Sequence, residues 1–191
     1  MAEIKEKLIL HSCCGPCSTA VIERLADDYD ITVFYYNPNI TDRDEYEHRK
    51  AEEIRFIGEF SMNTGKSIGF IEGDYNPEDY YKAAKGYEQE KEGGLRCREC
   101  FRLRLSKTAE KARELGIDIF DTTLTVSPYK NYALISEIAE QIAEQNNLRY
   151  LGGNYKKKDG YKRSIELSKE YGLYRQHYCG CEFSKGTGSE E

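Results

Sequence analysis

The seven cysteines are the residues of this sequence best suited to chemistry, and they fall into three groups. The groups are Cys13, Cys14 and Cys17 early in the chain, Cys97 and Cys100 in its middle, and Cys179 and Cys181 near its end. Side chains three residues apart on a helix, or two apart on an extended strand, lie on one face. Each group can therefore direct its thiols at one point, and thiolates so arranged bind metal ions or carry out redox chemistry.

The number of cysteines separates the metals that such a site could hold. A structural zinc is satisfied by four ligands, so two pairs would suffice and three thiols would be left over. A 4Fe-4S cluster also takes four thiolates, and the remaining three could hold a second metal, form a redox pair or be inert. A buried cysteine can also be simply a small apolar residue, which applies best to Cys17. The count favours iron over zinc and leaves zinc open.

Strands and helices that would position these cysteines alternate along the chain. Short apolar runs predict strands, and apolar residues recurring every three or four positions predict helices. The expected strands are 8–10, 31–36, 67–71, 119–126 and 149–151. The expected helices are 18–25, 41–60 with Thr41 as N-cap, 95–115 ending at Gly116, 131–145 and 162–171. Residues 74–94 are Tyr-rich and acidic, which indicates a helical insertion or lid that adds little to the core.

This alternation predicts an α/β fold, a three-layer parallel sheet of Rossmann-like type with a C-terminal extension that carries cysteines. We expect one domain over residues 1–183, with the insertion at about 74–94, and a disordered tail at 184–191. The first cysteine group directly follows the first strand, and open α/β sheets place ligands at the carboxyl ends of their strands.

Composition and charge limit the classes of function. The chain of 191 residues carries a net charge of -6, which argues against a protein that coats nucleic acid over its whole surface. It has no long apolar run and no secretory signal, so a cytoplasmic location is expected, where thiols stay reduced and disulfides are not expected. Two segments are locally basic, residues 96–113 and 156–163.

Four sequence blocks together resemble a known family. They are HSCCGPCS at 11–18, LRCRECFRLRL at 95–105, DTTLTVSPYKN at 121–131 and YRQHYCGC at 174–181. In this order and spread over most of the chain, they resemble the QueH-type epoxyqueuosine reductases. That family is similar in fold to the HUP-like, adenine nucleotide alpha hydrolase group, which agrees with the alternating elements.

The resemblance implies a cobalamin-independent reductase for the last step of queuosine synthesis in tRNA. Such an enzyme removes the epoxide oxygen of epoxyqueuosine at the wobble position. The resemblance implies a 4Fe-4S cluster with an additional adjacent iron, and a low-potential electron donor such as a ferredoxin or flavodoxin. The family's cysteines correspond to Cys13, Cys14, Cys97, Cys100, Cys179 and Cys181, with Cys17 as a further metal ligand.

The proposed reaction and substrate call for two further sets of residues. An acid must protonate the leaving oxygen, and the candidates that flank the blocks are Asp121, Tyr129, His177 and Tyr178. A tRNA substrate needs cations and aromatic side chains, and the candidates are Arg96, Arg98, Lys156, Lys157, Lys158, Lys162 and Arg163. Charged residues at 102–113 would either join that surface or be solvated helix charges. Ser127, Pro128 and Tyr129 are expected to border the pocket.

Two other classes of function stay open. One is a cluster-dependent tRNA sulfur-transfer enzyme, although thiols stand here where such folds carry a phosphate-binding SGGxDS loop. The other is a metal-bound tRNA-binding or sensor module without turnover.

Overall fold

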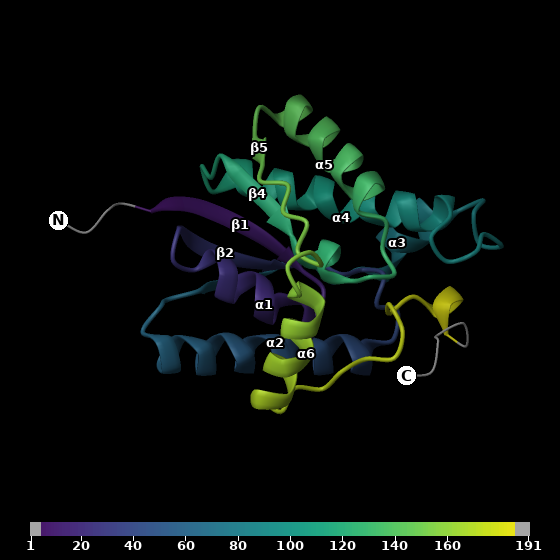
Figure 1. Cartoon of the computed structure of the whole chain (residues 1–191). Helices are drawn as coiled ribbons and strands as arrows, with labels where there is room; N and C mark the ends of the chain where they lie inside the picture. The colour runs from purple at the N-terminus through teal and green to yellow at the C-terminus, as the bar shows by residue number, and fades with distance from the viewer. Residues whose placement is uncertain (1–4, 186–191) are drawn as a thin grey trace.

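The core of the protein is a parallel sheet of five strands in the order β3-β2-β1-β4-β5 (Figure 1). The computed structural model describes residues 5–185. The strands are β1 (Glu6–Ser12), β2 (Tyr29–Tyr35), β3 (Gly69–Glu72), β4 (Ile119–Thr122) and β5 (Arg149–Tyr150). Every described pair of neighbouring strands runs parallel, with Leu10 of β1 opposite Val33 of β2 and Asp121 of β4. The predicted three-layer parallel α/β fold is confirmed.

Helices cover both faces of the sheet. They are α1 (Gly15–Leu25), α2 (Arg43–Thr64), α3 (Pro77–Ala84), α4 (Leu95–Glu114), α5 (Tyr132–Asn146) and α6 (Gly160–Glu170), with 3-10 turns η1 (Thr123–Val126) and η2 (Glu182–Ser184). Figure 1 shows α4 and α5 on one face and α1, α2 and α6 on the other, with the C-terminal segment running back along α2. No helix in the described part of the chain is long and apolar enough to cross a bilayer.

The sheet has a separate apolar core on each face because successive side chains of a strand point in opposite directions. Ile9 packs in one core with residues of α4 and α5, such as Leu105 and Ile138. Its neighbours Leu8 and Leu10 pack in the other core, with residues of α1 and α2. All three strand residues are completely buried. A central strand that is covered on both faces must bury every side chain, and this is why an uninterrupted apolar run predicted the strand.

The strand order reverses next to β1. The chain moves outward on one side through β2 and β3, and then crosses to the other side through β4 and β5. Loops that leave the carboxyl ends of β1 and β4 therefore diverge, and such a point leaves a crevice for ligands. Cys13 and Cys14 follow β1 directly, so the fold places the first cysteine group at this crevice.

Several expected boundaries were wrong. Asp42, and not Thr41, caps α2, because its carboxylate accepts hydrogen bonds from the backbone N–H groups of Asp44 and Glu45. The strand expected over 119–126 ends at Thr122, whose hydroxyl accepts from the Leu124 N–H and starts η1. The strand expected at 67–71 begins only at Gly69.

The insertion contributes few buried residues. Tyr80 and Ala84 of α3 are buried and pack against Cys100 and Cys181. Ser184, which lies within the range 184–191 expected to be a tail, is buried in η2. Residues 186–191 of that tail lie outside the described residues.

Candidate metal centre

The first group of thiols lies where β1 ends and α1 begins. The Sγ atoms of Cys13, Cys14 and Cys17 all lie within 4.8 Å of one another, and those of Cys13 and Cys14 are 3.9 Å apart. Cys14 is the N-cap residue of α1, with extended backbone, and Pro16 occupies the first turn. The amino end of a helix favours negative charge, so this position suits thiolates. This cysteine group could hold a metal ion.

Hydrogen bonding within the first group gives its members different proton affinities. Contacts from the thiols of Cys14 and Cys17 hold the pKa of Cys13 well below its usual value. The contact with Cys13 raises the pKa of Cys14 well above its usual value and that of Cys17 to about 12. Three sulfurs this close together, one of which loses its proton more readily than the other two, suit the binding of a metal ion.

The other four thiols line one pocket. Cys97 and Cys100 lie on the first turns of α4, and Cys179 and Cys181 lie in the segment after α6. The Sγ atoms of Cys179 and Cys181 are 3.5 Å apart. The pocket is also lined by residues of the loop before α2, of the insertion, of α4, of the loop before α5 and of α5 itself: Asn39, Tyr80, Glu92, Gly93, Phe101, Arg104, Tyr129, Lys130, Asn131 and Leu134. Folding therefore joins two cysteine pairs that lie far apart in sequence.

Proton affinity also differs among these four thiols. The hydrogen bond from Cys179 lowers the pKa of Cys181 to about 6, and the same contact raises that of Cys179. Burial raises the pKa of Cys97, and raises that of Cys100 to about 11. All seven cysteines are free thiols.

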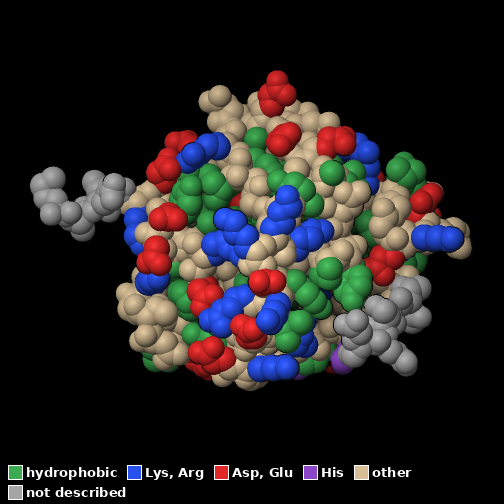
Figure 2. Space-filling model, in the orientation of Figure 1, with side chains coloured by type: hydrophobic (Ala, Val, Ile, Leu, Met, Phe, Trp, Pro, Cys, Tyr) green, Lys and Arg blue, Asp and Glu red, His purple; other side chains and the backbone are tan. Residues whose placement is uncertain are grey.

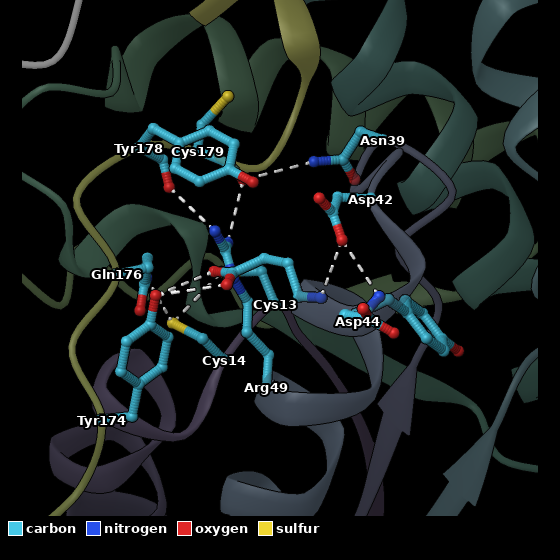
Figure 3. Close-up of polar contacts among 12 residues, drawn as sticks. Cys13, Cys14, Asn39, Asp42, Asp44, Arg49, Tyr174, Gln176, Tyr178 and Cys179 are labelled. Carbon is cyan, nitrogen blue, oxygen red and sulfur yellow. Dashed lines mark hydrogen bonds and ion pairs between the residues drawn. The ribbon is translucent and has the colours of Figure 1, made fainter. Parts of the chain in front are cut away.

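Side-chain packing and a hydrogen bond link the first cysteine group to residues of the four-thiol pocket and of the segment that carries the last cysteine pair. Cys13, Cys14 and Phe101 belong to one apolar cluster, against which Cys17 and Cys97 also pack. Gln176, next to the last cysteine pair, donates a hydrogen bond of 2.9 Å from Nε2 to the Cys14 sulfur (Figure 3).

A buried arginine holds the C-terminal segment against α2. Arg49 is 1% exposed and donates to the carbonyl oxygens of Tyr178 and Cys179, at 3.1 and 3.2 Å (Figure 3). Its Nε lies 2.6 Å from the Glu45 carboxylate, which also accepts from the hydroxyl of Tyr174. These contacts fix the backbone that carries Cys179. The sequence did not identify Arg49, because helical periodicity does not reveal what a distant segment will lay against a helix.

Two more cations reach the four-thiol pocket, and sequence reasoning did not single them out. Arg104 was expected to be solvated or to bind tRNA, but it is 3% exposed and lines the pocket. Lys130 lines the pocket from the loop before α5 and is half-buried. Burial by itself lowers the pKa of both groups, but the nearby cysteines raise it by more.

The four candidate acids occupy different surroundings. Tyr129 lies on the pocket lining and is 64% exposed, whereas Ser127 and Pro128, which were expected beside it, are not among the lining residues. Tyr178 stacks beneath Arg49, with the guanidinium 5.2 Å from its ring centre. His177 is exposed. Asp121 is completely buried, and its carboxylate accepts from the Tyr155 hydroxyl and the Thr122 and Gly153 N–H groups, outside the pocket lining.

The residues expected to bind tRNA divide according to their partners. Arg96 is 2% exposed, and its guanidinium donates to backbone carbonyls of the insertion, including that of Glu88, so it has no access to a phosphate. Arg98 pairs with Glu137, and Arg163 with Glu23 and Glu166. Lys156 donates to the carbonyl oxygen of Lys130.

Three lysines of this set are exposed, namely Lys157, Lys158 and Lys162. Lys158 and Lys162 line a groove between α1 and α6 together with Arg24. Figure 2 shows Lys and Arg side chains gathered in the middle of this face, with acidic side chains among them.

The donor set fits a metal with affinity for sulfur. Four thiols on one pocket match the number of ligands of a 4Fe-4S cluster, and three close thiols beside them match a further ion. The fold and this site together define an α/β protein with a group of thiols that could hold a metal ion at the crevice of a doubly wound sheet.

Comparison with known proteins identifies the family. The sequence profile described as epoxyqueuosine reductase QueH matches residues 8–187. A relative of that name from Streptococcus pyogenes serotype M1 is 44% identical over 181 residues, which are 95% of this chain and 71% of the relative. Those from Staphylococcus aureus and Thermotoga maritima are 42% and 37% identical, and the matches cover 95% and 93% of this chain and 76% and 89% of theirs. The chain belongs to the epoxyqueuosine reductase QueH family.

Proposed function

We propose that this chain reduces epoxyqueuosine to queuosine at the wobble position of tRNA. The observation that carries the proposal is the convergence of four thiols from two distant segments on one pocket, beside a cluster of three more. The names of the relatives support a reductase over a sulfur-transfer enzyme or a sensor module. The free thiols are consistent with action in the reducing cytoplasm.

Seven thiols are enough for two iron sites. Cys97, Cys100, Cys179 and Cys181 would hold a 4Fe-4S cluster, and Cys13, Cys14 and Cys17 would hold an additional iron. When bound, this iron supplies electrons and a Lewis acid for the epoxide oxygen. Removal of the oxygen consumes two electrons and two protons and leaves an alkene and water, so an external donor such as a ferredoxin or flavodoxin is required.

The residues of the chain must hold the substrate and deliver protons. Tyr129 is the candidate acid whose position fits best, because its phenol lies on the pocket lining and is open to a nucleotide that enters. The apolar part of the pocket wall, with Phe101 and Leu134, limits the entry of water. The exposed lysines 157, 158 and 162 would bind phosphates of the tRNA.

The proposal is tested with protein purified without oxygen. Wild-type protein should contain iron and acid-labile sulfide, and should convert epoxyqueuosine in tRNA when dithionite supplies electrons. The variant with Cys97→Ser and Cys100→Ser should lose the sulfide and the activity. Cys17→Ser is the matched control, since it should retain the sulfide and lose only iron. Unchanged sulfide in the double variant, or zinc in place of iron in the wild type, would refute the assignment.

A further inference from the structure

Arg104 is a buried cation without an acidic partner. It lies one turn beyond Cys100 on α4, is 3% exposed, and its Nε donates to the Cys100 carbonyl oxygen at 3.4 Å. Its guanidinium carbon lies 5.7 Å from the centre of the Phe101 ring. No carboxylate within residues 5–185 forms an ion pair with it. Burial of an unpaired guanidinium is costly, so a counter-charge is expected close by.

Lys130 places a second positive charge on the same pocket, from a different segment of the chain. It follows Tyr129 in the loop before α5, is half-buried and lines the pocket with Arg104. Over the part of the chain that the structure describes, its ammonium group likewise forms no ion pair with a carboxylate. Two cations from different elements thus face the same thiols.

The other two buried arginines among the described residues have their guanidinium groups satisfied differently. Arg49, 1% exposed, pairs with Glu45 at 2.6 Å. Arg96, 2% exposed, donates to backbone carbonyl oxygens of the insertion, including that of Glu88. The single carboxylate among the described residues of the pocket lining is Glu92, which is exposed. The groups beside Arg104 that can become negative are therefore the cysteines, and these raise its pKa in spite of burial, with Cys100 having the largest effect among them.

We infer that Arg104 is a positioning residue of the metal centre, whose buried guanidinium, together with the Lys130 ammonium, supplies the counter-charge of the thiolate–iron group and makes that group easier to reduce. The inference rests on the iron of the proposed function. Four thiolates give an iron–sulfur group net negative charge, and net charge and hydrogen bonding set its reduction potential. Each added electron increases that charge, so a fixed cation nearby favours the reduced form. A phosphate of the substrate could reach Lys130, but the burial of Arg104 excludes it there.

The test compares two substitutions of Arg104 with a matched control substitution on the same helix. Arg104→Met removes the charge and keeps a long apolar side chain, whereas Arg104→Lys keeps the charge. Arg102→Met is the control, because Arg102 lies on the same helix, is 38% exposed and is already paired with Glu99. Iron and sulfide per chain are measured first, and the midpoint potential is then measured by anaerobic titration followed by visible absorption. Far-UV circular dichroism checks folding.

We expect the midpoint potential of Arg104→Met to be more negative than that of the wild type, and those of Arg104→Lys and Arg102→Met to stay close to it. If Arg104→Met fails to retain iron, Lys130→Met should show the negative shift. The inference is overturned if the iron-loaded Arg104→Met variant has the midpoint potential of the wild type, or if the potentials of both Arg104 variants shift equally. The proposed function would stand in either case. Absence of iron from the wild-type protein would instead remove the proposed function as well.

Discussion

At the scale of single residues, burial decides the protonation of Asp121. Its carboxyl group is completely buried, and burial raises its pKa to about 7 although three hydrogen bonds to it act in the opposite direction. An unfolded aspartate titrates near pH 4. The folded protein therefore binds one more proton than the unfolded chain between these two values, and its stability falls as pH rises through that window.

Asp121→Asn should reduce this pH dependence. The amide does not ionise, so the variant should lose less stability than the wild type between pH 5 and pH 8, by about 3 kcal/mol. Urea unfolding at the two pH values measures the effect. Glu53, whose pKa burial also raises to about 7, contributes the same trend to both proteins and cancels in the comparison. Equal pH dependence in both proteins would show that Asp121 is ionised at neutral pH in the native state.

Residue chemistry could be predicted from the sequence where spacing determined it. The cysteine pairs were found because three residues on a helix or two on an extended segment direct side chains to one point. Arg49, Arg104 and Lys130 were missed, since each becomes important through a segment far away in the chain. Arg96 was assigned to tRNA because its charge was visible in the sequence and its burial under the insertion was not.

At the scale of elements, the C-terminal segment depends on α2 for its position. It carries Cys179 and Cys181 and has no regular structure between α6 and η2. Arg49 holds it through two carbonyl oxygens, and Arg55, further along α2, donates to the carbonyl oxygens of Tyr171 and Gly172. The long helix thus acts as a support along which the last cysteine pair reaches the pocket.

Arg49→Met should release this segment. The change removes the cation that pairs with the largely buried Glu45 carboxylate and donates to two carbonyl oxygens, which should cost about 2–4 kcal/mol in the free energy of unfolding. Amide hydrogen exchange at residues 174–181 should accelerate more than exchange in β1. Arg43→Met is the control, because Arg43 lies on the same helix with its side chain 76% exposed. Similar effects of the two substitutions would contradict a specific role of Arg49.

The elements themselves were predictable to different degrees. Long periodic segments such as α4, which ends before Gly116 as expected, follow from the pattern alone. The position at which β4 ends does not follow from the pattern, because β5 has only two residues and pairs only with Ile119 and Phe120. Residues 123–126 have apolar and β-branched side chains, but they lack a partner strand and form a 3-10 turn in which all four are buried.

At the scale of the whole molecule, charge is distributed unevenly. The chain carries a net charge of -6, yet exposed lysines gather beside the groove between α1 and α6. Many other basic side chains are neutralised by partners, as in the pairs of Lys107 with Glu110 and Lys111 with Glu114. A polyanion would therefore be attracted to one region and repelled by much of the remaining surface.

The variant with Lys157→Ala, Lys158→Ala and Lys162→Ala should bind tRNA more weakly, and the loss should be greatest at low salt. Each phosphate contact contributes roughly 0.7–0.9 to the slope of log affinity against log salt concentration, so the slope should decrease by about 2–3. Fluorescence anisotropy with labelled tRNA over a series of salt concentrations measures it. The control, Lys107→Ala with Lys111→Ala, removes two cations that already have acidic partners and should leave the slope unchanged. If the slope is the same in all three proteins, tRNA approaches the pocket over a different face, and the exposed lysines near α6 are only solvated charges.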